Sequence, residues 1–404
     1  MKKNIFITIA VAVIAFFSSC SKESAEESTT HEDVKPVVTQ PIKSNKANLF
    51  VHYMPWFVAP KNGQGVWGWH WTMANRNPDR IDSSGKREIA SHYYPLTGPY
   101  DSGDQTILDY QCLLMKYSGV DGVMVDWYGT QDKDDYSILL KNTEAIANAA
   151  AKAGLKFAVV YEDATLRHTS DPVGQLKRDL EYLKNNLFNK ANYVQVDGKP
   201  LFMVFGPRQY KSGKGWNEAL ESINKNVFFV SLNYHTQNIN NEGYNNSRGE
   251  FMWVEKYPNY DRARQFEFFI GGAMPGFHDF YTAGNAENSY ATHDSENGAL
   301  FARQLEAFKN SGFNWLQIST WNDYGEGTTI EPTREYGYKY LTMLQQFSGM
   351  PYEEGDLKRI YRWYELSVQH PGNCKLQSAY YLLSSYQIDK ADQLLNEVAK
   401  TDKP

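Results

Sequence analysis

The segment Trp315–Pro332 reads WLQISTWNDYGEGTTIEP and begins as an apolar run typical of a buried strand. It then breaks into a polar, glycine-containing cluster that includes Asp323 and Glu326. A strand that ends in such a cluster is how a rigid scaffold presents reactive groups at its rim. The same acids also fit the N-terminus of a helix opened by Pro332. Spacing within the segment does not decide between these two interpretations.

The rest of the chain alternates short apolar runs with stretches of helical periodicity, which predicts a parallel sheet. Helices are expected at 104–117, 135–153, 173–187, 216–223 and 299–310. Strands are expected at 49–54, 119–127, 155–161, 200–206, 227–233, 251–254, 272–276 and 315–320.

Eight such strands favour a closed (β/α)8 TIM barrel over residues 47–348. The competing fold is an open doubly wound sheet, but no glycine-rich phosphate loop follows the first strand. Two or three helices after Gly349 predict a small helical appendage at 349–404. In the barrel, Trp315–Pro332 becomes the last strand and the loop at its carboxyl end.

The N-terminal residues are expected to lie outside the fold. Lys2 and Lys3 precede an apolar run too short to span a membrane, and small residues precede Cys20. This pattern predicts a lipoprotein signal peptide at 1–19 with lipidation of Cys20; an ordinary secretory signal is the alternative. Polar residues 20–46 predict a disordered tether. We therefore expect a monomer anchored by lipid at the cell envelope, on the outer-membrane or periplasmic face, with surface display also open.

Composition narrows the classes of partner and cofactor. The formal net charge is −6, which argues against nucleic acid as a partner. No Cys and His pattern predicts a metal, and no motif predicts a cofactor. Cys112 and Cys374 could pair, but Cys112 lies in an apolar helical stretch and is better interpreted as a buried free thiol. Ten Trp and 28 Tyr exceed what packing needs and suit a sugar-binding cleft.

Carboxylates beside aromatic residues recur where the expected strands end. Glycoside hydrolysis needs two carboxyl groups across the scissile bond and aromatic walls for the sugar. Each residue also has a plain structural interpretation, such as a satisfied core histidine for His52 or loop packing for His70. We take Glu326, Glu162 and Asp323 as catalytic candidates. The binding candidates are His52, Tyr53, Trp56, His70, Trp71, Asp126, Trp127, Tyr234, His235, Trp321 and Asn322.

Several short motifs resemble known glycoside hydrolases over roughly residues 47–348. Trp321–Glu326 resembles the signature of glycoside hydrolase family 71, the α-1,3-glucanases. Glu326–Glu331 resembles the Glu-Gly-Thr-x-Ile-Glu stretch of family 99, the endo-α-mannosidases and endo-α-1,2-mannanases. His52–Trp56, Trp69–Trp71 and Asp126–Gly129 resemble further family 99 elements in order and spacing.

The resemblance to family 99 implies a metal-independent retaining enzyme that acts on α-linked glycans through a 1,2-anhydrosugar. It implies that Glu326 is the general acid and later base, that Glu162 activates the sugar 2-hydroxyl, and that Trp127 lines the −1 subsite. Asp323 stands where family 99 has glutamate. In family 71 the residues equivalent to Asp323 and Glu326 are themselves the proposed pair, with inversion.

The sequence therefore predicts a glycoside hydrolase that cleaves an α-mannan or α-glucan, as polysaccharide or oligosaccharide. The alternative is a lipid-anchored glycan-binding protein without catalysis, because aromatic clefts serve both roles. A purely structural envelope lipoprotein is a third hypothesis and predicts no glycan binding.

Overall fold

The computed structural model describes residues 38–61 and 64–400. The expected signal peptide, Cys20 and most of the expected tether lie outside these residues, so lipidation stays a prediction. Within the described ranges, no helix is both long and apolar enough to cross a membrane. Cys112 is a buried free thiol, as the sequence predicts.

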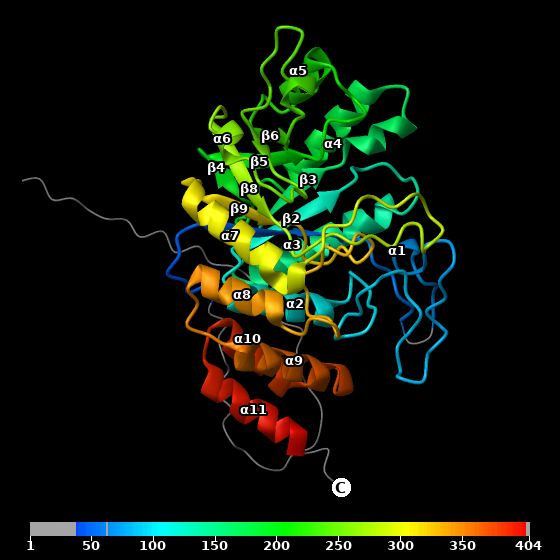
Figure 1. Ribbon diagram of the computed structural model, residues 1–404, viewed down its shortest axis with the longest axis vertical. Coiled ribbons are helices and arrows are strands. Elements are labelled where there is room, and N and C mark those ends of the chain that lie inside the picture. The colour runs from blue at the N-terminus through cyan, green and yellow to red at the C-terminus, as the bar shows by residue number, and fades with distance from the viewer. Residues whose placement is uncertain (1–37, 62–63, 401–404) are drawn as a thin grey trace, which may run out of the picture.

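Eight parallel strands close into a barrel in the described part of the chain (Figure 1). The barrel closes because β1 pairs with both β2 and β9 and because β3 pairs with β5. A two-residue strand, β4 (Gln195–Val196), adds an antiparallel pairing to β5. The eight strands are β1 (Asn48–Tyr53), β2 (Gly122–Trp127), β3 (Lys156–Tyr161), β5 (Lys199–Val204), β6 (Phe228–Leu232), β7 (Gly249–Phe251), β8 (Phe268–Ala273) and β9 (Trp315–Ile318).

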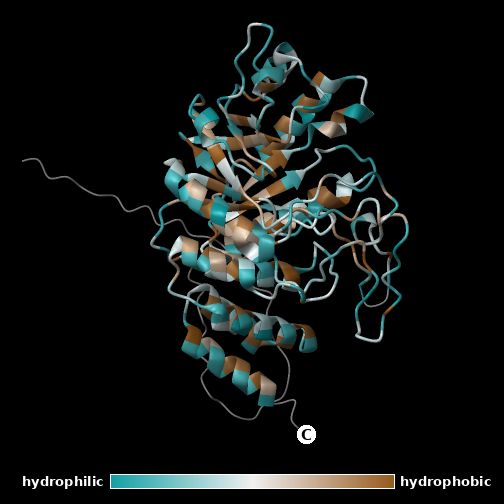
Figure 2. Cartoon of the chain, in the orientation of Figure 1, coloured by the Kyte–Doolittle hydropathy of each residue, from teal (hydrophilic) through white to brown (hydrophobic). Residues whose placement is uncertain are grey.

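Helices form the outer layer of the barrel, which confirms the predicted TIM-barrel class. Figure 2 shows apolar residues gathered along the strands inside this layer. The short α1 (Trp69–Thr72) lies in the long connection between β1 and α2. The remaining barrel helices are α2 (Gln105–Tyr117), α3 (Tyr136–Ala153), α4 (Pro172–Asn186), α5 (Gly213–Glu221), α6 (Tyr260–Ala263), α7 (Ala299–Ser311) and α8 (Lys339–Ser348).

Two strands begin earlier than the sequence analysis predicts. We expected strands at 251–254 and 272–276, whereas β7 and β8 occupy 249–251 and 268–273. Gly272 was expected to begin its strand, yet both Gly271 and Gly272 lie inside β8. A Cβ atom at Gly271 would approach Phe308 and Tyr260 to within 3 Å, so close packing explains the glycine there.

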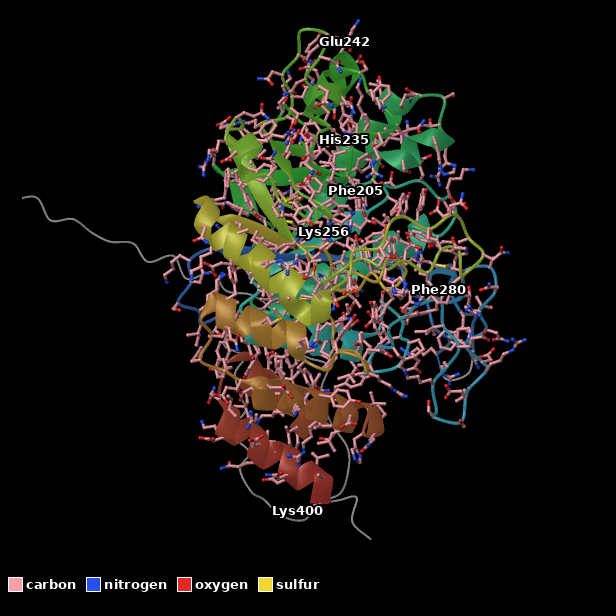
Figure 3. All side chains as sticks on the ribbon, in the orientation of Figure 1. Phe205, His235, Glu242, Lys256, Phe280 and Lys400 are labelled. Carbon is pink, nitrogen blue, oxygen red and sulfur yellow. The ribbon has the colours of Figure 1, made fainter. Side chains whose placement is uncertain are left out.

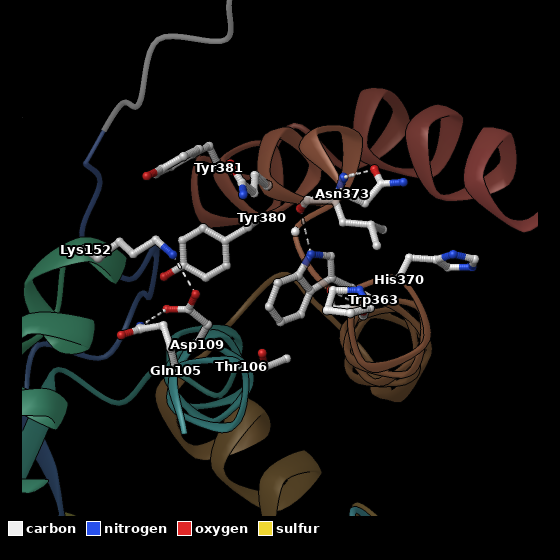
Figure 4. A pocket seen from close by; sticks show the side chains of 14 residues that line it. Gln105, Thr106, Asp109, Lys152, Trp363, His370, Asn373, Tyr380 and Tyr381 are labelled. Carbon is white, nitrogen blue, oxygen red and sulfur yellow. Dashed lines mark hydrogen bonds and ion pairs between the residues drawn. The ribbon is translucent and has the colours of Figure 1, made fainter. Parts of the chain in front are cut away.

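The C-terminal helices α9 (Glu354–Gln369), α10 (Cys374–Ser384) and α11 (Ile388–Lys400) pack beneath α2 (Figure 1). Figure 4 shows the contact between α10 and the barrel: Lys152 pairs with Asp109 at 2.5 Å and lies 3.8 Å from the centre of the Tyr380 ring. The Trp363 indole donates a hydrogen bond of 2.9 Å to the carbonyl of Leu376. The predicted appendage is thus continuous with the barrel core.

This packing predicts that the appendage unfolds together with the barrel. Leu357 on α9 is fully buried, so Leu357→Ala should lower the free energy of unfolding by about 2–5 kcal/mol. Val368 on the same helix is 57% exposed, and Val368→Ala should change that free energy by less than about 0.5 kcal/mol. Denaturant titration followed by circular dichroism should show one transition. A separate early transition in Leu357→Ala would contradict a shared core.

Candidate active site

A cavity of about 130 Å³ lies at the carboxyl ends of the barrel strands. It gathers four carboxyl groups from three strand ends, together with aromatic side chains. All three catalytic candidates line it, and so do the binding candidates His52, Trp56 and Asp126. The full lining is His52, Met54, Trp56, Asp126, Tyr128, Glu162, Phe205, Trp253, Tyr281, Asp323 and Glu326.

The alternation of side chains along a strand decides which residues face this cavity. In the register of β2 and β3, Asp126 lies opposite Val160 and Trp127 opposite Tyr161. Asp126 and Glu162 point into the barrel end, whereas Trp127 points outward. The Trp127 ring is fully buried, 6.1 Å from the ring of Tyr182 on α4. The structure therefore does not place Trp127 at the sugar site that the family resemblance implied.

Three further candidates belong to the core around the cavity and not to its lining. Tyr53, the neighbour of His52, points outward and donates a hydrogen bond of 2.8 Å to Gln111 on α2. Trp71 is fully buried, and its indole donates to the carbonyl of Tyr100 at 2.8 Å. Trp321 is also fully buried, and its backbone N–H donates to the carbonyl of His52 at 2.7 Å.

Tyr234 and His235 lie beyond the end of β6, away from the cavity. Tyr234 adopts a positive φ of 65°, and the chain turns there. Its ring stacks under the guanidinium of Arg262 at 4.1 Å, while Nδ1 of His235 lies 2.8 Å from the carbonyl of Asn233. In Figure 3, His235 is seen between Phe205 and Glu242. The strand-end rule placed these two residues at the rim but not at the carboxyl groups.

Asn322 and His70 do not line the cavity but contact residues that do, Met54 and Trp56. The Asn322 side chain accepts a hydrogen bond from the backbone N–H of Met54 at 2.8 Å and donates one to the Met54 carbonyl at 3.0 Å. It thereby ties the loop after β9 to the loop after β1. The ring of His70 stacks on Trp56 at 4.1 Å and 5°, so it holds in place an aromatic wall of the cavity.

Removal from water changes the acidity of all four carboxyl groups. Burial raises the pKa of Glu162 to about 8 and that of Asp323 to about 7. Burial, with the charge of Asp323 beside it, holds the pKa of Glu326 well above its ordinary value. Burial and then the charge of Glu162 do the same for Asp126. The cluster therefore retains protons near neutral pH, as a general acid must.

Among the described residues, one carboxyl oxygen of Glu326 has a hydrogen-bond partner and the other has none. Its backbone N–H donates to Asp323 Oδ1 at 2.8 Å, and the Tyr281 hydroxyl donates to Glu326 Oε1 at 3.2 Å. Oε2 is buried and has no hydrogen-bond partner among the residues that the structure describes. Asp126 Oδ1 is in the same situation. One fixed oxygen and one free oxygen is the arrangement that proton transfer to a bound molecule needs.

Sequence reasoning missed several residues of the lining. Tyr281 comes from the long connection between β8 and α7, where the buried Asp279 accepts backbone N–H bonds from Tyr281 at 3.2 Å and Tyr290 at 2.7 Å. No local pattern indicates that this connection folds over the site. Trp253 was expected only as a strand residue, yet it lies 4.6 Å from the ring of His52. Burial lowers the pKa of His52 to about 3, so this histidine is neutral.

Glu331, the last acid of the Glu326–Glu331 stretch, does not reach the cavity. Its carboxylate accepts hydrogen bonds from Tyr100 at 2.7 Å, Gln111 at 2.6 Å and Tyr324 at 2.8 Å. Burial nevertheless raises its pKa to about 7. With every donor aimed at it from the surrounding core, Glu331 anchors the loop after β9.

Among the described residues, no group of three or more His, Cys, Asp or Glu side chains is placed to hold a metal ion.

The chain is similar to several curated proteins named as endo-alpha-1,2-mannosidases or as endo-alpha-1,2-mannosidase-like proteins. Among curated proteins, a glycoprotein endo-alpha-1,2-mannosidase-like protein of Danio rerio is 22% identical over 333 residues, covering 74% of this chain and 75% of its own length. A glycoprotein endo-alpha-1,2-mannosidase of Mus musculus is 21% identical over 332 residues, covering 73% and 71%.

Among solved structures, the GH99 endo-alpha-mannosidase from Bacteroides thetaiotaomicron superposes with a TM-score of 0.55 at 19% identity, over 86% of this chain and 97% of that chain. This likeness shows the shared fold. A family model described as glycosyl hydrolase family 99 matches residues 45–363, which contain the whole barrel and the cavity. The chain therefore belongs to glycosyl hydrolase family 99.

Proposed function

We propose that the protein hydrolyses α-mannosidic linkages within a glycan, with Glu326 as the proton donor. The observation that carries this proposal is Glu326 itself: its pKa is raised, Tyr281 fixes Oε1, and Oε2 has no hydrogen-bond partner among the described residues. The relatives named endo-alpha-1,2-mannosidase support α-1,2-linked mannose as the first substrate to examine. The walls formed by Trp56, Phe205 and Trp253 suit the apolar faces of a sugar.

In the proposed reaction, the Glu326 carboxylic acid gives its proton to the glycosidic oxygen as the bond to the anomeric carbon breaks. A second carboxylate takes the proton of the 2-hydroxyl, whose oxygen attacks the anomeric carbon and closes a 1,2-anhydrosugar. Glu326, now ionised, takes a proton from water. That water opens the ring, and the proton held by the second carboxylate returns to the 2-oxygen, so the configuration is retained.

We assign the second carboxylate to Glu162. Asp323 Oδ1 already accepts the backbone N–H of Glu326, and Thr320 Oγ1 accepts the backbone N–H of Asp323 at 2.7 Å. These bonds give Asp323 a role in shaping the loop, and its side chain is one methylene shorter than the glutamate of the family. The Glu162 carboxylate lines the same cavity, and no hydrogen bond of this kind holds it among the described residues.

The assignment of Glu326 predicts a large and selective loss of activity. Glu326→Gln keeps the shape but has no proton to give, so kcat/KM for an α-1,2-mannan oligosaccharide should fall by roughly 10²–10⁴-fold. For an aryl mannoside with an acidic leaving group, kcat/KM should fall much less, because this leaving group needs little protonation. Tyr281→Phe keeps the acid and should lower kcat/KM by about tenfold or less.

Product analysis by NMR during wild-type turnover should show the retained anomer first. Initial release of the inverted anomer would contradict Glu162 as the group that activates the 2-hydroxyl and favour Asp323 as a base. Hydrolysis by Glu326→Gln at the wild-type rate would remove Glu326 from the mechanism. No hydrolysis of any α-mannan, α-glucan or aryl glycoside by the wild type, with glycan binding intact, would favour the non-catalytic alternative.

The raised pKa values predict an unusual pH profile. The second carboxylate must be ionised, so kcat/KM should rise with pH through an acid limb between about 7 and 8, where Asp323 and Glu162 lose their protons. Activity should fall again at higher pH as Glu326 loses its proton. In Glu162→Gln the residual activity should lack the limb assigned to Glu162. An acid limb near pH 4, as for exposed carboxylates, would contradict the buried cluster.

The loop geometry predicts that Gly327 fixes Glu326. Gly327 has a φ of 67°, and a Cβ atom there would lie 2.4 Å from the carbonyl oxygen of His278. Gly327→Ala should therefore shift the loop and lower kcat/KM by at least about tenfold. Gly372→Ala is the matched control, because Gly372 has a φ of 81° with open space around it. That control should cost about 1 kcal/mol of stability and leave kcat/KM unchanged. Equal kinetics for the two variants would contradict the prediction.

A further inference from the structure

A second pocket, of about 360 Å³, adjoins the catalytic cavity. The two share Phe205, Trp253 and Glu326, so a glycan seated at Glu326 extends directly into this pocket. Aromatic side chains of Phe277 and Tyr290 form part of its wall. Unlike the catalytic cavity, it also contains a guanidinium group, that of Arg208.

The loop that carries Arg208 is fixed by a buried carboxylate. Asp163, fully buried, accepts backbone N–H bonds from Arg208 at 2.9 Å, Gln209 at 2.7 Å and Tyr210 at 2.9 Å. Gly206 has a φ of 149°, and a Cβ atom there would lie 2.8 Å from Asp163 Oδ1. The backbone of Arg208 is therefore held in place before any ligand binds.

The Arg208 guanidinium is positioned but not neutralised. It lies 4.6 Å from the centre of the Phe205 ring, which is a wall of both cavities. It makes no ion pair with any described residue, although it is close enough to Glu326 and Glu162 to lower the pKa of each. An arginine held on an aromatic face with its donors open is suited to a planar or tetrahedral oxyanion, which it binds with two parallel hydrogen bonds.

The neighbouring carboxyl groups do not supply that oxyanion. Burial favours the protonated form of Glu326 and raises the pKa of Glu162 to about 8, so the cluster carries less negative charge near pH 7 than its composition suggests. His293, half-buried in the same pocket, adds a second group that is able to donate hydrogen bonds. Its loop is pinned by two backbone hydrogen bonds to Phe277, at 2.9 and 2.8 Å.

We propose that this pocket, through Arg208, binds an anionic substituent of the glycan next to the cleaved linkage, so that the preferred substrate is an acidic α-linked glycan. The substituent is a sulfate ester, a phosphate or the carboxylate of a uronic acid, which share the oxyanion that Arg208 recognises. This inference rests on the proposed glycosidase function and specifies its substrate class.

The test measures binding separately from turnover. Glu326→Gln, in which turnover is slow, is titrated by isothermal calorimetry with matched α-linked mannose oligosaccharides that are neutral, sulfated, phosphorylated or capped with a uronic acid. At least one acidic ligand should bind roughly tenfold more tightly than its neutral counterpart. The ligand that does so identifies the substituent. Raising the salt concentration from about 50 to about 500 mM should lower the affinity for that ligand and leave the affinity for the neutral ligand unchanged.

Adding Arg208→Gln should cost the acidic ligand about tenfold more affinity than it costs the neutral ligand, and Arg208→Lys should restore part of the difference. Arg362→Gln, at a half-buried position on α9 where the guanidinium donates to Asn396 on α11, is the matched control and should change neither affinity. Asp163→Asn should reduce the preference for the acidic ligand, because it loosens the Arg208 loop.

Acidic and neutral ligands that bind alike, or a preference that survives Arg208→Gln, would overturn the inference while leaving the proposed glycosidase function intact. A preference that depends on Arg208 in a wild-type protein that hydrolyses none of the ligands would instead overturn the proposed function and leave the binding assignment standing.

Discussion

Four carboxyl groups share one small cavity; Asp126 and Asp323 are buried there, and Glu162 and Glu326 are partly buried. Each of them would be more stable as an ion in solution, and burial is the largest cause of the raised pKa of Asp126, Glu162, Asp323 and Glu326. The free-energy cost of burying these acids falls at the strand ends. There the alternation of side chains points the acids inward, and aromatic residues form the walls of the cavity. The proposed chemistry depends on that constraint, because only a buried carboxyl group keeps a proton to donate near neutral pH.

The surrounding structure supports the cluster with acids that do not take part in the reaction. Glu331 draws together Tyr100, Gln111 and Tyr324 beneath the loop after β9, and Asp163 fixes the loop after β5 through three backbone N–H groups. Asn322 joins the loops after β1 and β9. These bonds connect loops far apart in sequence and explain how a cavity made from seven segments keeps a defined shape.

The barrel could be predicted because its signal is local and repeated: short apolar strands alternate with amphipathic helices. Glu162 could be predicted because it directly follows such a strand, and Glu326 because it lies in the loop after the last strand. Trp127 could not be placed correctly from a strand-end rule alone, since one residue of register turns its side chain from the cavity to the helix layer. The same alternation, applied from the inward-facing Asp126 and His52 along their own strands, would have excluded Trp127 and Tyr53.

Tyr281 and Arg208 were beyond sequence reasoning for a different reason. Both lie on long or irregular connections whose path depends on tertiary contacts, through Asp279 for Tyr281 and through Asp163 for Arg208. No periodicity constrains such segments, so their side chains enter the site without a local signal.

The most direct measurement is a crystal structure of Glu326→Gln with an uncleaved α-linked oligosaccharide. The account predicts that the glycosidic oxygen lies within hydrogen-bond distance of residue 326, and that the 2-hydroxyl of the sugar on the cleaved side points to Glu162. A glycan bound in the barrel with its linkage remote from residue 326, or bound only elsewhere on the protein, would contradict it.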